Sequence, residues 1–397
     1  KLQKDVIEAE VEVIRLMGAE FRYGVEVGRD VTLDELRAQG FKAFYVAIGC
    51  QGGRLAGIPG EDAEDVTVAV DFLREVNSGK VDALPGRTIV VGGGNVAIDV
   101  ARNACRLGSE HVEMFCLESE AQMPASEEER REAVEDGAHI SCGWGPKEVH
   151  LDEAGRVCGI TFKRCTRVMD DEGRFAPEYD ENDLRRVDAD RVVMSIGQSI
   201  VWGDLLAGSK VELGRGQGAL ADPQTYQTAE PDIFVGGDVY TGPSFAIDAI
   251  AAGHEAAVSI HRFVQPGSTL TIGRNQRRYT ALDRDDVVIE SYDNASREVA
   301  RVDREREKAA PFSEYVETFT EEQVRTETAR CLGCGASIVD PNKCIGCGLC
   351  TTKCAFDAIH LDRDRPECST MVKYEQKLPS LGKYALKRAI KIKFGKK

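Results

Sequence analysis

The sequence lacks any long hydrophobic run. No apolar stretch in its 397 residues approaches the roughly 18 to 20 residues that span a bilayer, and no signal peptide opens the chain. We therefore expect no membrane span and a cytoplasmic location. Residue 1 is Lys, and residues 1–21 have the pattern of an amphipathic helix that runs straight into a strand, so the sequence is expected to begin inside a domain.

Positive charge is scarce as well. The chain has 51 Lys and Arg against 67 Asp and Glu, a formal net charge of −16. This balance argues against a nucleic-acid binder, which needs a basic surface to hold phosphates. The last fifteen residues, 383–397, are the exception, with seven Lys or Arg and no acid. We expect this basic tail to dock on an acidic surface of a partner subunit; a solvated chain end is the alternative.

Cysteine is sparse over the first 330 residues and dense after them. Six of the thirteen cysteines are scattered singly and are expected to be buried structural thiols. They are Cys50, Cys105, Cys116, Cys142, Cys158 and Cys165. The other seven fall within 38 residues, which favours metal or cluster binding over disulfides. They are Cys331, Cys334, Cys344, Cys347, Cys350, Cys354 and Cys368.

A glycine-rich turn joins an apolar strand to a helix in the segment TIVVGGGNVAIDVA, residues 88–101. The spacing Gly92-x-Gly94-x-x-Ala97 in this context is typical of dinucleotide-binding folds. Gly92 permits the tight turn, Gly94 lets the backbone approach a pyrophosphate, and Ala97 lets the helix lie close to the strand. The free N–H groups of the helix N-terminus then face the phosphates.

The next strand ends in the segment FCLESE, residues 115–120, where such folds read the adenosine ribose. A carboxylate at Glu118 accepts hydrogen bonds from ribose hydroxyls and repels a 2′-phosphate, with no arginine expected nearby to compensate. This favours NAD(H) over NADP(H). A solvated residue at a strand end is the alternative for Glu118.

A second strand end has a different composition. The segment IFVGGDVYTGPSFAIDAIAAG, residues 233–253, delivers Gly236, Gly237 and Asp238 from an apolar strand, and a helix follows within a few residues. An Asp in this place binds a polyol hydroxyl, and a helix N-terminus stabilises negative charge on a reduced flavin.

Several motifs in this order resemble the small subunit of bacterial glutamate synthase and its relatives. The motifs are NVAIDVAR, MPAS, SIGQ, GGDVYTGPSFAIDAIAAG and RCLGCG, and the resemblance covers about residues 1–335. Similar proteins include the flavin half of dihydropyrimidine dehydrogenase and the large subunit of NADH-dependent ferredoxin:NADP oxidoreductase. The resemblance implies an α/β flavoprotein with two dinucleotide-binding domains, a Rossmann-like NAD domain inserted in an FAD domain. It further implies cofactor contacts at Asn95, Val96, Gly197, Ser244 and Ala246.

The sequence departs from this family in three places. The N-terminal FAD-phosphate glycine loop is absent, so FAD binding is inferred from half a site. Where NADP-using relatives place arginines before MPAS, this chain has Leu117, Glu118 and Glu120, which again favours NAD(H). The iron–sulfur domain, usually N-terminal in the family, is replaced by a ferredoxin-like α+β module at the C-terminus.

The C-terminal module has the spacing Cys344-x2-Cys347-x2-Cys350-x3-Cys354 of a bacterial ferredoxin half. In such a half, the first three thiolates hold one [4Fe–4S] cluster and the fourth ligates a neighbouring cluster. A zinc site is the alternative, although zinc favours two separated cysteine pairs.

A second cluster would need further ligands. Cys331 and Cys334 could share it with Cys354, and Cys368 could complete one of the two sites. Seven cysteines are one short of eight, so one iron takes a different ligand or the module holds a single cluster. We favour two clusters.

We expect six segments along the chain. They are a partial FAD-binding domain without its N-terminal phosphate loop (1–84), an NAD(H)-binding domain (85–228), a return segment of the FAD domain (229–266), a charged connector (267–330), an iron–sulfur module (331–370) and a basic tail (371–397).

Together these features predict a flavin-dependent NAD(H) oxidoreductase subunit of a larger redox complex. NAD(H) would exchange a hydride with FAD, and single electrons would pass through the clusters to a partner subunit or ferredoxin. One alternative is a glutamate synthase small-subunit-type donor that uses NADPH, and another is a non-catalytic, cluster-bearing scaffold. A thiol–disulfide oxidoreductase is disfavoured, because no Cys-x2-Cys pair occurs outside the C-terminal module.

The cysteine count makes a prediction about metal content. The purified chain or its complex should contain roughly eight iron and eight acid-labile sulfide per chain, since two cubane clusters require that number. Colorimetric iron and sulfide assays check it. A content of about four of each would reduce the prediction to one cluster, and stoichiometric zinc without iron would contradict it.

Overall fold

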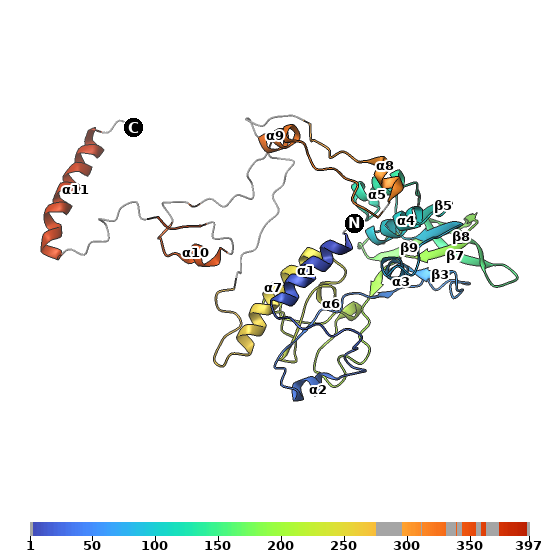
Figure 1. Cartoon of the computed structure of the whole chain (residues 1–397), viewed down its shortest axis with the longest axis horizontal. Coiled ribbons are helices and arrows are strands. Elements are labelled where there is room, and N and C mark those ends of the chain that lie inside the picture. The colour runs from blue at the N-terminus through green and yellow to red at the C-terminus, as the bar shows by residue number, and fades with distance from the viewer. Residues whose placement is uncertain are drawn as a thin grey trace. The chain divides into compact units, whose positions relative to one another are not determined.

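The computed structural model describes residues 3–274, 296–310, 312–330, 339, 344–354, 359–362 and 373–394. These residues divide into two units, which are described separately below (Figure 1). Residues 1–288 and 300–318 belong to the first unit, and residues 289–299 and 319–397 belong to the second.

A five-stranded parallel sheet forms the larger half of the first unit. Its strand order is β3–β10–β4–β5–β6, and all neighbouring strands are parallel. The strands are β3 (Val66–Val68), β4 (Arg87–Val91), β5 (His111–Cys116), β6 (His139–Cys142) and β10 (Arg191–Met194). The helices between them are α3 (Ala69–Asn77), α4 (Asn95–Arg106), the 3₁₀ turn η1 (Glu120–Gln122) and α5 (Glu127–Glu135).

The sequence of β4 explains its central position in this sheet. Ile89, Val90 and Val91 are all buried, as expected of a parallel strand that is covered on both faces. Helix α4 lies close to the sheet because it presents fully buried small residues, among them Ala97 and Ala101. The strand order reverses between β10 and β4, and in such sheets a ligand is expected to bind at the carboxyl ends of the strands at this point.

An antiparallel three-stranded sheet packs beside the parallel one. It consists of β7 (Trp144–Leu151), β8 (Val157–Met169) and β9 (Phe175–Val187), in the order β7–β8–β9. The ring of Phe115 on β5 stacks on that of Phe162 on β8, with centroids 3.9 Å apart. Both rings are fully buried, so the two sheets share one apolar core.

The smaller half of the first unit contains the two strands expected to carry the flavin. β1 (Phe44–Val46) pairs in parallel with β12 (Ile233–Val235), and β2 (Gly52–Gly53) pairs antiparallel with β11 (Gln198–Ser199). The other elements are α1 (Lys4–Leu16), α2 (Leu33–Ala38), the 3₁₀ turn η2 (Arg215–Gln217), α6 (Asp238–Thr241) and α7 (Ala246–Phe263). Helix α1 buries none of its residues, so its apolar side chains remain exposed.

An arm within residues 300–318 packs on the half that contains the five-stranded parallel sheet. It includes α8 (Arg304–Ala309), and the hydroxyl of Tyr315 accepts a hydrogen bond from Arg106 Nη2 at 2.6 Å. Asp136, which is almost fully buried, pairs with both Arg102 and Arg106, at 2.7 and 3.1 Å. Part of the predicted connector is therefore held in place by a buried group of opposite charges.

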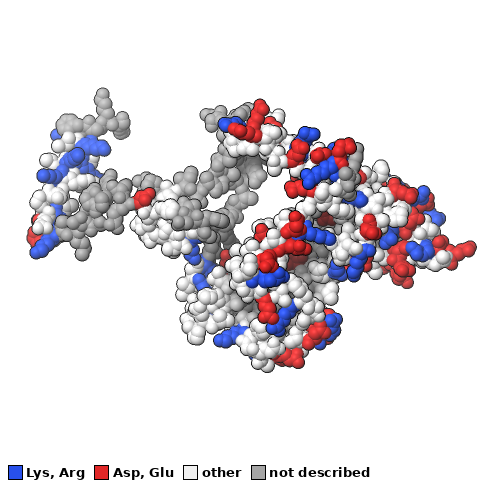
Figure 2. All heavy atoms as spheres, viewed as in Figure 1, with Lys and Arg blue, Asp and Glu red and all other residues white. Residues whose placement is uncertain are grey.

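The described residues of the second unit form short or isolated helices. They are α9 (Glu321–Ala329), α10 (Leu349–Lys353) and α11 (Tyr374–Phe394). Lys and Arg side chains lie along α11, which covers most of the predicted basic tail (Figure 2). Within the described part of the chain, no helix is both long enough and apolar enough to cross a membrane.

Two expectations differ from this structure. The strand expected directly after the N-terminal helix does not form, because residues 20–28 are irregular and exposed apart from a single bridge between Val27 and Val31. No strand of the described residues lies beside them to satisfy their backbone. In addition, β3 and α3 precede the expected boundary at residue 84/85 and yet belong to the five-stranded parallel sheet and its helices, because β3 pairs with β10.

Candidate functional site

The glycine loop between β4 and α4 lies at the sheet edge where the strand order reverses. Gly92 has a φ of +143°, and a Cβ added to it would lie 2.2 Å from the carbonyl oxygen of Ser195. Only glycine allows the two strand ends to approach this closely. The hydroxyl of Ser195 is buried there without a hydrogen-bond partner in the described part of the chain.

Gly94 provides the open side of this loop. It caps α4 with an extended conformation, and a Cβ added to it would meet nothing within 4 Å. The first turn of α4, which includes Asn95 and Val96, contains no acidic residue. A helix N-terminus with free N–H groups and no nearby carboxylate on its own turn is suited to an anion. The loop therefore fits the pyrophosphate of a dinucleotide.

The MPAS segment, residues 123–126, is held to the loop by hydrogen bonds. The N–H of Ala125 donates to the carbonyl of Gly93 at 3.0 Å, and the N–H of Ser126 donates to Asn95 Oδ1 at 3.1 Å. The side-chain oxygen of Asn95 thus already holds the protein's own backbone. Among the predicted cofactor contacts, the structure gives Asn95 this positioning role.

The structure brings Glu118 to the loop, as its sequence position predicted. A Cβ added to Gly93 would lie 2.9 Å from Glu118 Oε2 and equally close to Cβ of Cys116. The half-buried carboxylate therefore faces the middle glycine of the loop. From this position it is available to accept hydrogen bonds from a ribose next to a bound pyrophosphate.

Two arginines from a distant strand lie near this strand end. A pocket of about 350 Å³ is lined by Leu117 and, across from it, by Arg164 and Arg167 of β8. Arg164 Nε pairs with Asp183 at 3.2 Å, and Arg167 Nη1 pairs with Asp171 at 3.2 Å. Both guanidinium groups therefore already have carboxylate partners.

A third arginine approaches from α5. Arg130 Nη1 donates to the carbonyl oxygen of Glu120 at 2.6 Å. The expectation that no arginine lies near this strand end is therefore wrong. The three arginines come from β8 and α5, so their positions depend on packing that the local motif does not reveal.

The residues predicted to bind the flavin lie between the end of β12 and the start of α6. Gly236 and Gly237 are buried, and Asp238 is half-buried with Oδ1 accepting the N–H of Ser244 at 3.3 Å. Ser244 and Ala246, at the start of α7, are both exposed. A carboxylate and a helix N-terminus exposed together fit a polyol and a polar ring edge.

A buried hydroxyl group also lies beside the flavin end. A Cβ added to Gly236 would lie 2.1 Å from the hydroxyl of Tyr45 on β1. This hydroxyl is buried with no hydrogen-bond partner in the part of the chain that the structure describes. The close contact explains why the first of the two glycines must lack a side chain.

The β2–β11 ladder connects the strand ends at the glycine loop with the segment predicted to bind the flavin. β11 begins at Gln198, directly after the predicted contact Gly197. Gln198 Nε2 donates to the carbonyl of Cys50 at 3.2 Å, and the Cys50 thiol lies 3.8 Å from the carbonyl oxygen of Asp238. Burial raises the pKa of Cys50, and the nearby Asp238 adds to this effect, so the thiol stays protonated near neutral pH.

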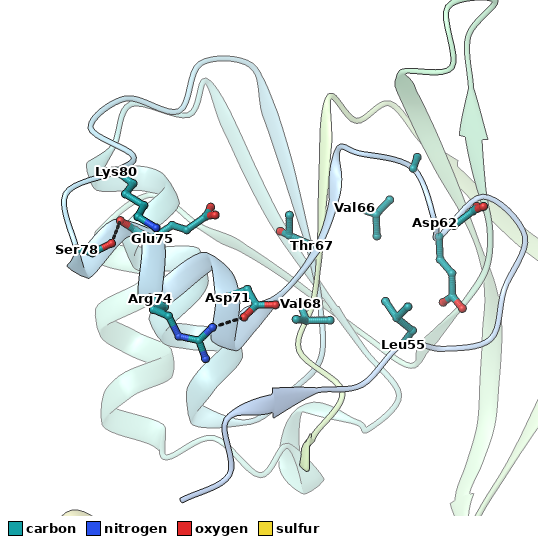
Figure 3. Close-up of a pocket in the computed structure, with 12 residues that line it drawn as sticks. Leu55, Asp62, Val66, Thr67, Val68, Asp71, Arg74, Glu75, Ser78 and Lys80 are labelled. Carbon is teal, nitrogen blue, oxygen red and sulfur yellow. Dashed lines mark hydrogen bonds and ion pairs between the residues drawn. The ribbon is translucent and has the colours of Figure 1, made fainter. Parts of the chain in front are cut away.

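A larger pocket, of about 530 Å³, lies beside edge strand β3 and helix α3 (Figure 3). Arg74 and Asp71, which line it, pair with each other at 2.7 Å. The carboxylate of Glu61 accepts N–H groups of Ala56 and Gly57. The charged groups of this pocket are thus already paired within the protein. The glycine loop at Gly94, by contrast, has open space beside it.

The cysteine module is described only in part. Cys344, Cys347 and Cys350 are exposed and Cys354 is half-buried, and none of the four forms a disulfide. A left-handed Gly348 turns the chain into α10 between the second and third cysteines. Cys331, Cys334 and Cys368 lie outside the described residues.

Among the residues described, no three metal-ligating side chains gather tightly enough to hold a metal ion. Cluster ligands commonly assemble as the metal binds, because the site is not preformed in its absence. The described cysteines are mostly exposed and lie on a tightly turned backbone. This arrangement suits a cluster whose ligands come together only when it binds.

Sequence reasoning missed three residues of this site. Gly93 packs under Glu118, Ser195 packs against Gly92, and Gln198 links the two cofactor ends. The glycine run at 92–94 was a usable signal for Gly93. Ser195 and Gln198 belong to the SIGQ motif, but their roles arise from contacts across more than 100 residues, which the motif by itself does not reveal.

Comparison with known proteins assigns the chain to a family. Residues 3–253 match the pyridine nucleotide-disulphide oxidoreductase family, and residues 337–360 match the 4Fe-4S binding domain. The chain belongs to the pyridine nucleotide-disulphide oxidoreductase family. It is a redox enzyme, and these matches imply FAD, NAD(P) and a 4Fe–4S cluster as its cofactors.

Three relatives confirm the predicted resemblance. The NADP(+)-dependent formate dehydrogenase subunit beta of Moorella thermoacetica is 32% identical over 347 residues, 84% of this chain and 48% of the relative. The glutamate synthase [NADPH] small chain of Escherichia coli (strain K12) is 32% identical, with 67% and 59% covered. The NAD-dependent dihydropyrimidine dehydrogenase subunit PreT of the same organism is 31% identical, with 67% and 58% covered. The chain spans about half the length of these curated relatives.

A solved structure supports the predicted fold class. FprA of Mycobacterium tuberculosis in complex with NADPH aligns with a TM-score of 0.52 at 20% sequence identity, over 64% of this chain and 72% of that one. At this identity the likeness concerns the fold alone. The α/β architecture with two dinucleotide-binding domains and a C-terminal 4Fe–4S domain is therefore confirmed.

The two outer glycines of the loop make a paired prediction. Gly94→Ala should fold normally, because its Cβ has free space, and should weaken dinucleotide binding at least about tenfold, or about 1.4 kcal/mol, by obstructing the pyrophosphate. Gly92→Ala should instead lose about 1 to 3 kcal/mol of stability through its contact with Ser195. Nucleotide titration and urea unfolding measure the two effects.

The matched control is Gly382→Ala, which also adds a methyl group in open space but lies in α11. It should leave nucleotide affinity unchanged. If a folded Gly94→Ala variant bound the nucleotide as tightly as the unmodified protein, the assignment of the glycine loop as the pyrophosphate site would be wrong.

Proposed function

We propose that this chain is a flavin-dependent NAD(H) oxidoreductase subunit of a larger complex. In this proposal NAD(H) and FAD exchange a hydride, and single electrons pass through [4Fe–4S] clusters, two in number, to a partner subunit or ferredoxin. The segment limits predicted from the sequence form part of the proposal, with the NAD(H)-binding part extended to include β3 and α3.

The observation that carries this proposal is the hydrogen-bonded junction between the two cofactor ends. Gln198 comes shortly after β10 of the five-stranded parallel sheet. Its side chain donates a hydrogen bond to the carbonyl of Cys50, which lies in the smaller half of the first unit. Hydride transfer requires two cofactors to lie nearly in van der Waals contact, so the protein must hold their binding elements together. The β2–β11 ladder supplies that link within one unit.

The residues of the chain position and select cofactors in this proposal. FAD supplies the redox chemistry, because a flavin accepts two electrons together and releases them one at a time. Gly94 and the N-terminus of α4 hold the pyrophosphate of the nucleotide, and Glu118 holds its ribose. Asp238 and the N-terminus of α7 hold polar groups of the flavin cofactor. No side chain is required to act as an acid or base in hydride transfer.

Nucleotide choice follows from the charge beside the loop. The Glu118 carboxylate lies against Gly93, where a 2′-phosphate on the adenosine ribose would meet a like charge. Arg164 and Arg167 line the neighbouring pocket together with Leu117, but each is already paired with an acidic residue. The relatives include both NAD- and NADP-dependent enzymes, so local charge is the better guide.

Flavin reduction by the two nucleotides tests this choice. NADH should reduce the flavin more efficiently than NADPH by on the order of 10- to 100-fold, since the repulsion and the missing ion pair are worth about 1.4 to 3 kcal/mol. Glu118→Arg combined with Leu117→Arg should narrow or invert this ratio in stopped-flow measurements on the purified holoenzyme.

Glu110→Arg is the matched control, because it makes a similar charge change at an exposed position just before β5. It should leave the ratio unchanged. If the unmodified protein used NADPH equally well or better, the proposed role of Glu118 would be wrong.

A glutamate synthase small-subunit-type donor that uses NADPH is the second candidate. The similarity to the glutamate synthase small chain over 67% of this chain favours it. The 4Fe-4S match at the C-terminal end and the acidic strand end at Glu118 argue for the first candidate instead.

We place the contact with a partner subunit on α11. Its residues are exposed, and its Lys and Arg outnumber Glu375, its one acidic residue. Tyr374, Leu378, Leu381 and Ile392 recur at helical spacing and are all more than half exposed. A basic helix with exposed apolar side chains suits an acidic partner surface that has an apolar centre.

Charge neutralisation tests this contact. Lys387→Gln, Arg388→Gln and Lys391→Gln together should weaken assembly of the complex, most strongly at low salt, where charge attraction is least screened. The matched control replaces three exposed arginines elsewhere, Arg174, Arg301 and Arg325, with Gln. Size-exclusion recovery of the complex at low and high salt provides the measurement. Equal recovery for all forms would favour a solvated tail.

A further inference from the structure

Two thiols lie together at the carboxyl ends of β5 and β6. Cys116 and Cys142 are direct partners in the parallel ladder, and their sulfur atoms are 3.6 Å apart. Neighbouring strands are about 4.8 Å apart, which lies within the Cα separation that a disulfide spans. The two cysteines therefore need no rearrangement of the fold to form a bond.

The two thiols differ in their access to solvent. Cys116 is almost completely buried, whereas Cys142 is half-buried and lines the pocket of about 350 Å³ that also contains Arg164. A small molecule in the pocket reaches Cys142 first. Cys116 lies directly behind it.

Cys116 also packs against the dinucleotide loop. A Cβ added to Gly93 would lie 2.9 Å from Cβ and 3.5 Å from Sγ of Cys116, so no space separates them. The Cys116 thiol is 3.7 Å from the carbonyl oxygen of Glu118. Forming a disulfide closes the sulfur–sulfur distance from 3.6 Å to roughly 2 Å, and any displacement of Cys116 in this step is passed to the loop packed against it.

We propose that Cys116 and Cys142 are a thiol modification site, which low-molecular-weight disulfides convert to an intrachain disulfide that weakens dinucleotide binding. The effect on binding rests on the proposed function of the adjacent loop. Formation of the bond itself does not depend on that function.

The reaction balances in two exchanges. The Cys142 thiolate attacks a small disulfide, forms a mixed disulfide and releases one small thiolate, which takes up a proton. The Cys116 sulfur then attacks the Cys142 sulfur, gives up its proton and releases the second small thiol. The two cysteines lose two electrons and two protons, and the small disulfide gains them.

The environment of Cys116 sets the pace of the second exchange. Burial raises the pKa of this thiol, and the neighbouring Cys142 raises it further, so little thiolate is present near neutral pH. The bond should therefore form slowly. It responds to sustained oxidising conditions and not to brief ones.

The test uses the full chain with its cofactors under argon, treated with glutathione disulfide. Mass spectrometry after alkylation should find the peptides of Cys116 and Cys142 joined, with the loss of two hydrogens. NADH affinity, measured by equilibrium titration, should fall at least about tenfold and recover after addition of dithiothreitol. Cluster absorbance, followed in the same samples, separates this effect from damage to the iron–sulfur module.

Three variants sharpen the result. Cys142→Ser should keep its NADH affinity in glutathione disulfide, and Cys116→Ser should show the same NADH affinity before and after this treatment; Cys142→Ser suffices if the buried substitution prevents folding. Cys158→Ser is the matched control, because Cys158 is half-buried and its thiol contacts the carbonyl of His150. It should remain as sensitive to oxidation as the unmodified chain.

The possible results distinguish the disulfide proposal from the proposed function. A mixed disulfide on Cys142 alone, or a joined pair with unchanged NADH affinity, would overturn the proposal. Failure of the fully reduced protein to bind NADH would count against the proposed function, and peptide analysis would still decide whether the disulfide forms.

Discussion

The contact between Gly92 and the carbonyl oxygen of Ser195 is the constraint on which the candidate site depends. The ends of β4 and β10 approach so closely there that even a methyl group does not fit. This approach sets the start of α4, where open space surrounds the position of a Cβ at Gly94. From Ser195 the chain needs only three residues to reach Gln198 and the flavin half. One close backbone contact thus aligns the nucleotide loop with the second cofactor end.

Charge has two distinct uses in the first unit. Arg102 and Arg106 share the buried Asp136 and hold the arm that carries Tyr315, so these charges stabilise the fold. A buried ion group of this kind is costly to break, because removing one partner leaves unpaired charge in a region of low dielectric. Glu118 is different, since it is only half-buried and faces the open glycine loop. It remains available to a ligand.

Several parts of the fold were predictable because the sequence carries a local signal for them. The apolar run of β4, the glycines that follow it and the small residues of α4 specify a strand, a turn and a closely packed helix. Residues 20–28 show the limit of such reasoning. Their alternating apolar pattern suits a strand, but a strand forms only where a neighbour accepts its hydrogen bonds, and the described chain provides a single bridge.

The sequence by itself determined the cofactor classes, because glycine spacing and cysteine spacing are dictated by local backbone geometry and ligand number. It also placed Glu118 at a strand end beside the loop. Only the tertiary structure decided what surrounds that strand end. Arg164 arrives from β8, and Cys142 meets Cys116 across a parallel ladder. These neighbours come from distant segments, and their proximity follows from strand register and sheet packing, which no local pattern encodes.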